Sequence, residues 1–188
     1  MEVVLKANIE LPEEASLVDT FGANGVGLYR TEFLFMNRDE MPGEEEQYEA
    51  YLRVLRAMPG QQVTIRTLDL GADKQVDGLR FTDNLHSVTS ALGLRAVRLC
   101  LREPDLFRPQ LRAILRASAH GQVWAMIPML SNLEEVQQVK LLIAEVKAEL
   151  DAEGLAYNPA MPLGGMIEVP AAAMAAPLFA RQLDFLSI

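Results

Sequence analysis

The chain has 188 residues, half of them hydrophobic, and a net charge of -9. This length can bury one hydrophobic core, so we treat residues 1–188 as a single domain. The acidic balance argues against nucleic acid and anionic membrane surfaces as partners. No apolar run is long enough to span a membrane, and residues 1–8 lack a signal-peptide pattern. The single cysteine, Cys100, excludes an intrachain disulfide framework and favours a reducing compartment, so we expect a cytoplasmic protein.

Short apolar runs alternate with amphipathic stretches along the chain. The apolar runs predict strands at residues 3–9, 26–30, 63–68, 123–130, 163–169 and 184–188. Helices are predicted from Pro12 to just before Gly22, after Pro42, over residues 105–119, from 131 to 154 and from Pro170 onward. Ser131 and Glu134 resemble a capping box at the start of the fourth of these helices.

Strands that alternate with helices through short connections predict βαβ units and a parallel sheet. No Gly-x-Gly-x-x-Gly turn follows the first strand, which argues against a dinucleotide-binding open sheet. Polar residues at strand ends favour an α/β fold of the (β/α)8 TIM-barrel type, where functional groups lie at the carboxyl ends. A full barrel needs roughly 250 residues, so we expect about six of its eight βα units here and a truncated chain. The first and sixth strands would then have exposed edges.

Two of the predicted strands end in an arginine. Arg30 follows the apolar residues 26–29, and Glu32 lies two residues later. Arg66 ends the next strand, and Asp69 follows it by three residues. Because a guanidinium presents a planar fork that suits phosphate and carboxylate, these strand ends predict an anion site. The alternative is that each arginine pairs with its neighbouring acid and only fixes a loop.

Five segments of the chain carry a family resemblance when they are taken together and in order. They are GLYRTEFLFM (27–36), RTLDLGADK (66–74), LGLRAVR (92–98), QLRAILRASAHG (110–121) and MIEVPAA (166–172). They resemble Enzyme I of the bacterial sugar phosphotransferase system, the phosphoenolpyruvate-protein phosphotransferase family, including the Enzyme I module of fructose-type multiphosphoryl transfer proteins. The related phosphoenolpyruvate synthases and pyruvate dikinases share the Arg-Thr-Glu core, but Tyr29 and residues 69–74 resemble Enzyme I more closely.

The resemblance implies a phosphoenolpyruvate-binding barrel that forms a homodimer and phosphorylates the phosphocarrier protein HPr through a separate N-terminal region. It implies that Arg30, Arg66 and Arg95 bind the phosphate and carboxylate of phosphoenolpyruvate. Lys74 would add a further positive charge on the phosphate side. Glu168 would be one of two carboxylates that hold Mg²⁺, the expected cofactor.

We interpret Glu32 and Asp69 as groups that orient these arginines. The family motif Asn-Pro-x-Leu-Gly is altered before Arg95, because residues 85–90 replace its proline with a longer segment.

No catalytic residue is expected in this chain. The thiol that protonates the pyruvate enolate in the family, and its second Mg²⁺ carboxylate, lie beyond the sixth strand. Cys100 belongs to an apolar helical pattern and is expected to be a small buried residue. His86 and His120 lack the context of the family's phosphorylated histidine. We therefore expect the fragment alone to be inactive.

The leading hypothesis is the phosphoenolpyruvate-binding part of an enzyme that passes a phosphoryl group to a histidine for sugar uptake. One alternative is a non-catalytic binding or dimerisation module. Two others are a barrel like that of the phosphoenolpyruvate synthases and pyruvate dikinases, and an Mg²⁺-dependent lyase barrel. The arginine-rich face argues against the lyase.

Overall fold

The structure, a computed structural model, describes residues 3–36, 38, 40–70 and 93–188. Within these ranges one parallel sheet has the strand order β1-β2-β3-β4-β5-β6, and each strand pairs with the next in sequence. The strands are β1 (Ala7–Ile9), β2 (Gly25–Arg30), β3 (Gln62–Arg66), β4 (Gln122–Ile127), β5 (Leu163–Met166) and β6 (Phe185–Ser187). The predicted parallel sheet is confirmed.

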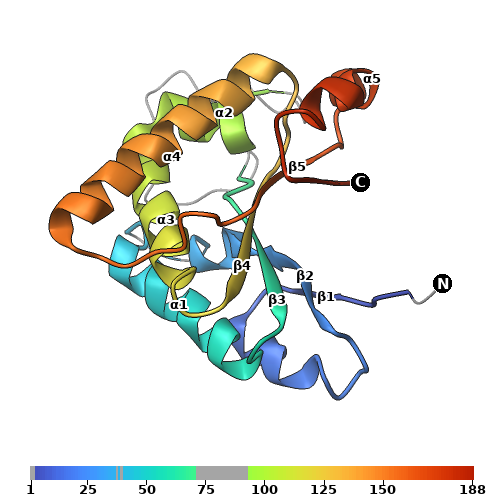
Figure 1. Ribbon diagram of the computed structural model, residues 1–188, viewed down its shortest axis with the longest axis vertical. Coiled ribbons are helices and arrows are strands. Elements are labelled where there is room, and N and C mark those ends of the chain that lie inside the picture. The colour runs from blue at the N-terminus through green and yellow to red at the C-terminus, as the bar shows by residue number, and fades with distance from the viewer. Residues whose placement is uncertain (1–2, 37, 39, 71–92) are drawn as a thin grey trace.

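Helices alternate with the strands and cover one face of the sheet. They are α1 (Glu44–Ala57), α2 (Ala96–Arg102), α3 (Pro104–Ala117), α4 (Leu133–Glu153) and α5 (Pro170–Phe179), with short 3-10 helices η1 (Pro12–Leu17) and η2 (Thr31–Leu34). Figure 1 shows α1, α2, α3 and α4 on one side of a curled sheet whose other side is open. This arrangement is a partial (β/α)8 barrel, so the predicted fold class is confirmed.

Several element boundaries differ from the sequence prediction. The first strand is shorter than expected because pairing with β2 covers only Ala7–Ile9. The fourth and fifth strands end before residues 128–130 and 167–169, which form βα loops. The helix expected before Gly22 is the 3-10 helix η1. The predicted Ser131–Glu134 capping box is wrong by one residue, because Asn132 accepts from the Glu135 amide and the Glu135 carboxylate accepts from the Asn132 amide.

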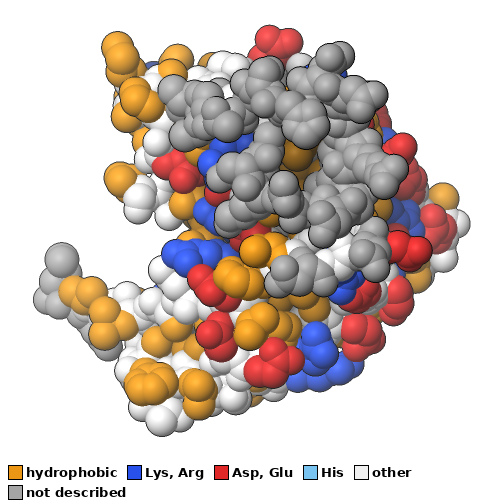
Figure 2. Space-filling view, turned by 180° about the vertical axis from the view of Figure 1, so that it is seen from behind, with side chains coloured by type: hydrophobic (Ala, Val, Ile, Leu, Met, Phe, Trp, Pro, Cys, Tyr) orange, Lys and Arg blue, Asp and Glu red, His pale blue; other side chains and the backbone are white. Residues whose placement is uncertain are grey.

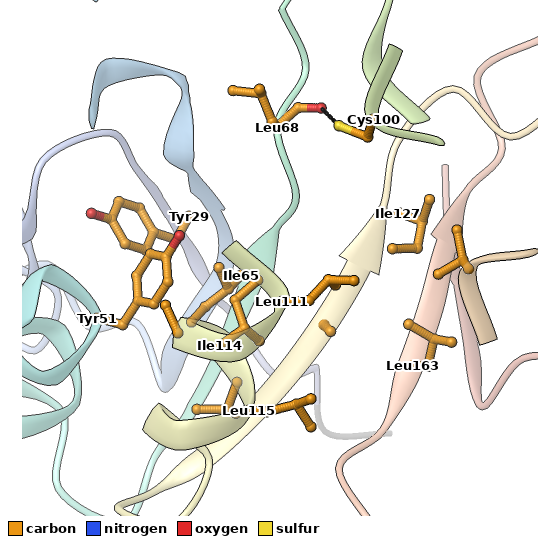
Figure 3. Close-up of a cluster of buried hydrophobic side chains, with 14 of the residues drawn as sticks. Tyr29, Tyr51, Ile65, Leu68, Cys100, Leu111, Ile114, Leu115, Ile127 and Leu163 are labelled. Carbon is orange, nitrogen blue, oxygen red and sulfur yellow. Dashed lines mark hydrogen bonds between the residues drawn. The ribbon is translucent and has the colours of Figure 1, made fainter. Parts of the chain in front are cut away.

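The hydrophobic core lies between the sheet and its covering helices. Figure 3 shows side chains from β2, β3 and β4 against α1 and α3, with the Tyr29 and Tyr51 rings edge to face at 6.0 Å. Cys100 is fully buried, as predicted, and its Sγ lies 4.0 Å from the carbonyl oxygen of Leu68. Burial raises the pKa of this thiol far above its ordinary value, so it stays protonated.

Large side chains also cross the concave face of the sheet. Lys6, before β1, donates to Gln62 of β3, and its Nζ lies 5.4 Å from the centre of the Trp124 ring. The Trp124 ring lies 4.9 Å from the Phe185 ring of β6. Gly164 makes room for that ring, since a Cβ there would lie 2.4 Å from it. These contacts connect β1, β3, β4 and β6 across the inside of the curl.

An arginine row on α3 ties this helix to its two neighbours. Its members are spaced by four residues and therefore lie on one face of the helix. The ion pairs join Arg108 to Glu145 and Glu149, Arg112 to Glu44, Glu149 and Glu153, and Arg116 to Glu44 and Glu45. Glu44 and Glu45 lie on α1 and the other acids on α4, so the row holds the outer helical layer together.

Replacing Arg112 with methionine keeps an aliphatic stem and removes three charge-assisted contacts. We expect Arg112→Met to lower the free energy of unfolding by about 1 to 2 kcal/mol in urea denaturation at low salt, and by less in about 1 M salt. Arg56→Met is the control, because Arg56 is exposed and lies 3.7 Å from a single acid, Glu49. Equal effects of the two substitutions would contradict the account of the row.

Candidate functional site

The carboxyl ends of β2 and β3 bring two of the predicted arginines side by side. Arg30 is the register partner of Arg66 in the parallel ladder. The Arg66 guanidinium is largely buried, and its Nη2 contacts Glu32 Oε1. Its Nη1 lies 3.2 Å from Asp69 Oδ2 and 3.8 Å from the Met166 sulfur on β5. The buried cation is therefore held by two acids, one in η2 after β2 and one in the loop after β3.

Asp69 joins a further predicted arginine to this group. Arg95, the residue before α2, donates from Nη2 at 2.8 Å and from Nε at 3.1 Å to Asp69 Oδ1. One carboxylate thus bridges two guanidinium groups. The next residue, Ala96, has a left-handed φ of 49°, and its amide donates to the carbonyl oxygen of Leu70. Such a backbone state is uncommon for a residue with a side chain and often marks a functional site.

Arg30 has a partner that sequence reasoning missed. Its Nη1 lies 2.7 Å from Glu10 Oε1, in the segment that follows β1, and both side chains are partly exposed. The alternative pairing of Arg30 with Glu32 is wrong, because Glu32 contacts Arg66 at the end of the neighbouring strand instead. The alternative pairing of Arg66 with Asp69 is confirmed. Glu10 gave no signal in the sequence, since only the parallel order of β1 and β2 brings its strand end beside Arg30.

Two buried polar atoms in this cluster lack hydrogen-bond partners among the described residues. They are Glu32 Oε2 and Arg66 Nε. Burial is the main cause that raises the pKa of Glu32 above its ordinary value, while Arg66 opposes the shift. Unsatisfied buried groups are costly and call for a ligand or water. The described residues therefore leave hydrogen-bonding capacity of the cluster unused.

Glu168 lies in the loop after β5 and is exposed. Its Oε1 accepts from the Met129 amide at 2.7 Å, and Met129 has a left-handed φ of 57°. The described ranges hold no group of three or more His, Cys, Asp or Glu side chains that could bind a metal. Mg²⁺ takes one or two carboxylates with water and substrate oxygens, so the single carboxylate of Glu168 does not by itself complete a site.

Some of the predicted residues cannot be placed. Lys74, His86 and the altered segment 85–90 lie outside the described residues. His120, for which no role was expected, lies near α1, where its Nε2 is 2.9 Å from the Tyr48 hydroxyl.

Figure 2 shows basic side chains next to acidic ones around a recess in the molecule. The recess lies between the part that carries the N-terminus and the part that carries α5, which is the open side of the curled sheet in Figure 1. A helix that crosses a membrane is not found in the described ranges, since none combines the required length with an apolar composition.

A curled parallel sheet with charged side chains at the carboxyl ends of its strands defines an α/β domain of the barrel class. The family model for the phosphoenolpyruvate-binding domain of phosphoenolpyruvate-utilising enzymes matches residues 1–188, and the chain belongs to this family.

Curated proteins with the name phosphoenolpyruvate-protein phosphotransferase are similar to the whole chain. The protein from Cupriavidus necator is 53% identical over 100% of this chain, and those from Staphylococcus epidermidis and Staphylococcus carnosus are 48% identical over 98% and 99%. The chain spans 32% of the length of each of these relatives.

The raised pKa of Glu32 predicts how its contribution to stability changes with pH. The folded state holds this proton more tightly than the unfolded state, whose carboxyl keeps an ordinary value of 4.5. The stability that the protonated Glu32 carboxyl contributes is therefore complete below pH 4.5 and is lost as pH rises through its raised pKa in the folded state. We expect wild type to lose stability relative to Glu32→Gln as pH rises from about 4 to 7, measured by urea denaturation.

Glu46→Gln is the control, because the pKa of Glu46 is shifted in the opposite direction to that of Glu32. Its hydrogen bond to Arg38 lowers the pKa of Glu46, so wild type should lose stability relative to this variant as pH falls. The account of Glu32 is wrong if both variants show the same pH trend.

Proposed function

We propose that the protein binds phosphoenolpyruvate at the carboxyl ends of β2 and β3 and serves an enzyme that transfers its phosphoryl group to a protein histidine. The observation that carries this proposal is the register pairing of Arg30 with Arg66, with Arg95 joined through Asp69. The family of phosphoenolpyruvate-utilising enzymes and the names of the similar proteins support it. They do not favour the synthase, dikinase or lyase alternatives.

The physical chemistry of phosphoryl transfer suits this arrangement. Its transition state spreads negative charge over several oxygens, so catalysis consists mainly of positioning and charge neutralisation. Arginine binds such oxygens in pairs through its planar fork. Glu32 and Asp69 fix the Arg66 guanidinium before the ligand arrives, which reduces the ordering cost of binding.

Isothermal titration calorimetry of the protein with phosphoenolpyruvate tests the proposal. Arg66→Lys keeps the positive charge but removes the fork, so we expect the dissociation constant to rise at least about tenfold. Arg102→Lys is the matched control, because Arg102 is exposed at the end of α2, and it should bind like wild type. Failure of wild type to bind, or equal affinity of both variants, would overturn the proposal.

We also propose that Mg²⁺ takes part, with Glu168 as one ligand and a second acid from outside the described residues. Bound Mg²⁺ would neutralise charge on the substrate oxygens. The tight contact of Glu168 Oε1 with the Met129 amide supports a fixed carboxylate at this strand end. The residues described here do not supply the remaining ligands.

Calorimetry with and without Mg²⁺ tests this role of Glu168. We expect Mg²⁺ to strengthen binding of phosphoenolpyruvate in wild type and to have little effect in Glu168→Gln. Glu49→Gln, on the exposed face of α1, should respond to Mg²⁺ like wild type. A full Mg²⁺ response in Glu168→Gln would exclude Glu168 as a ligand.

The proposed partners follow from the same function. They are phosphoenolpyruvate, a phosphocarrier protein such as HPr, reached through a region outside this chain, and a second copy of the protein in a homodimer. We propose a cytoplasmic location, which the buried free thiol of Cys100 supports. The chain alone is expected to bind phosphoenolpyruvate without turning it over.

A further inference from the structure

A buried hydrogen-bond network lies directly beneath the charged cluster. Its members, Gln110 of α3, Thr31 of η2, and Tyr51 and Gln47 of α1, are all at most 1% exposed. The network links these helices to the strand ends that carry the arginines. Sequence reasoning did not single out any of these residues for a polar role.

Gln110 has every polar group of its side chain in use. Its Oε1 accepts from the Leu68 amide at 2.8 Å, and its Nε2 donates to Thr31 Oγ1 at 3.1 Å and to the Tyr51 hydroxyl at 3.4 Å. The Leu68 amide can only donate, so it fixes which end of the Gln110 amide is the oxygen. The remaining hydrogens must then point to Thr31 and Tyr51.

This orientation of Gln110 also determines which groups donate and which accept in the branch that leads to the charged cluster. Thr31 Oγ1 accepts from Gln110 and gives its own proton to the backbone oxygen of Arg66 at 2.9 Å. Gln110 thus holds two points of the β3 end, the Arg66 carbonyl through Thr31 and the Leu68 amide directly. Thr31 also lies between Arg30 and Glu32 in sequence. The same network therefore fixes the backbone next to Arg30, Glu32, Arg66 and Asp69.

The branch on the other side leads away from the site. The Tyr51 hydroxyl accepts from Gln110 and donates to Gln47 Oε1 at 3.1 Å, and Gln47 Nε2 donates to the carbonyl of Pro42. This branch ties α3 to the start of α1 and reaches no charged residue of the cluster. Removing the hydroxyl of either Thr31 or Tyr51 breaks one hydrogen bond of Gln110. Substitutions in the two branches can therefore be compared directly.

We propose that Gln110 and Thr31 are positioning residues for the arginine cluster, an inference that rests on the proposed function. They set the separation and direction of the β2 and β3 ends, and hence where Arg30 and Arg66 present their guanidinium groups. A displacement of about 1 Å at a reacting group can cost about a hundredfold in rate, so this backbone link matters for binding geometry.

Three substitutions in the protein separate positioning from general stability. Thr31→Val keeps the volume and removes the hydroxyl, and we expect the dissociation constant for phosphoenolpyruvate to rise about threefold to tenfold. Thr31→Ser keeps the hydroxyl and should restore binding to within about twofold of wild type. Tyr51→Phe should lower the urea midpoint but leave the dissociation constant unchanged. Equal effects of Thr31→Val and Tyr51→Phe on binding, or no rescue by serine, would overturn the proposal.

A second readout keeps the positioning inference testable if wild type fails to bind phosphoenolpyruvate, a result that refutes the proposed function itself. In ligand-free protein we expect Thr31→Val to shift the NMR signal of the Arg66 Nε–H group, with Thr31→Ser close to wild type. Tyr51→Phe should leave that signal in place. An Arg66 signal that is unchanged in Thr31→Val, or shifted equally in Tyr51→Phe, would refute positioning by the network independently of any ligand.

Discussion

The buried guanidinium of Arg66 is the constraint on which the arrangement of the site depends. A charge in this position is costly unless acids and hydrogen bonds surround it. Glu32 and Asp69 meet that requirement from two different loops, and Asp69 extends the group to Arg95. The loops after β2 and β3 and the start of α2 are thereby fixed relative to one another. The helical layer outside supports this geometry, since α3 is bound to α1 and α4 by its row of arginines.

The same interaction balances charge in the absence of a ligand. Arg66 has two acids and Arg30 has Glu10, so the guanidinium groups already have carboxylate partners. A phosphate or carboxylate that binds here must share or replace these partners. Because Glu10 and Arg30 are partly exposed while Glu32 and Arg66 are buried, the outer pair is the easier one to exchange. In the proposed binding mode the inner pair would be the fixed receptor, and the outer arginine would turn toward the ligand.

Much of the fold was predictable because the signals are local and repeated. Alternating apolar runs and amphipathic stretches indicated the parallel sheet, and the arginines that end β2 and β3 indicated which edge carries charge. Five ordered segments indicated the family, which the match to the whole chain confirmed. The strand ends were overestimated, because an apolar residue such as Ile127 and the loop residues after it look alike in sequence.

The partners within the site were less predictable. Glu10 pairs with Arg30, and Glu32 with Arg66, because of the register between strands that are far apart in sequence. Gln110 reads as one polar residue in an amphipathic helix, and only its burial beneath two strand ends shows its importance. The cap of α4 shifted by one residue because Asn132 and Ser131 are both good capping types. For the ion pairs and for Gln110 the outcome depends on distances in space that sequence spacing does not encode.

The most direct test of the central claim is an NMR titration of the arginine Nε–H signals with phosphoenolpyruvate. The account predicts that the Arg66 signal shifts and saturates with the ligand, since its Nε has no partner among the described residues. The signal of Arg102, exposed at the end of α2, should stay in place. A saturating titration that leaves Arg66 unchanged, or that shifts both signals equally, would contradict the claim that Arg66 is the fixed centre of the anion site.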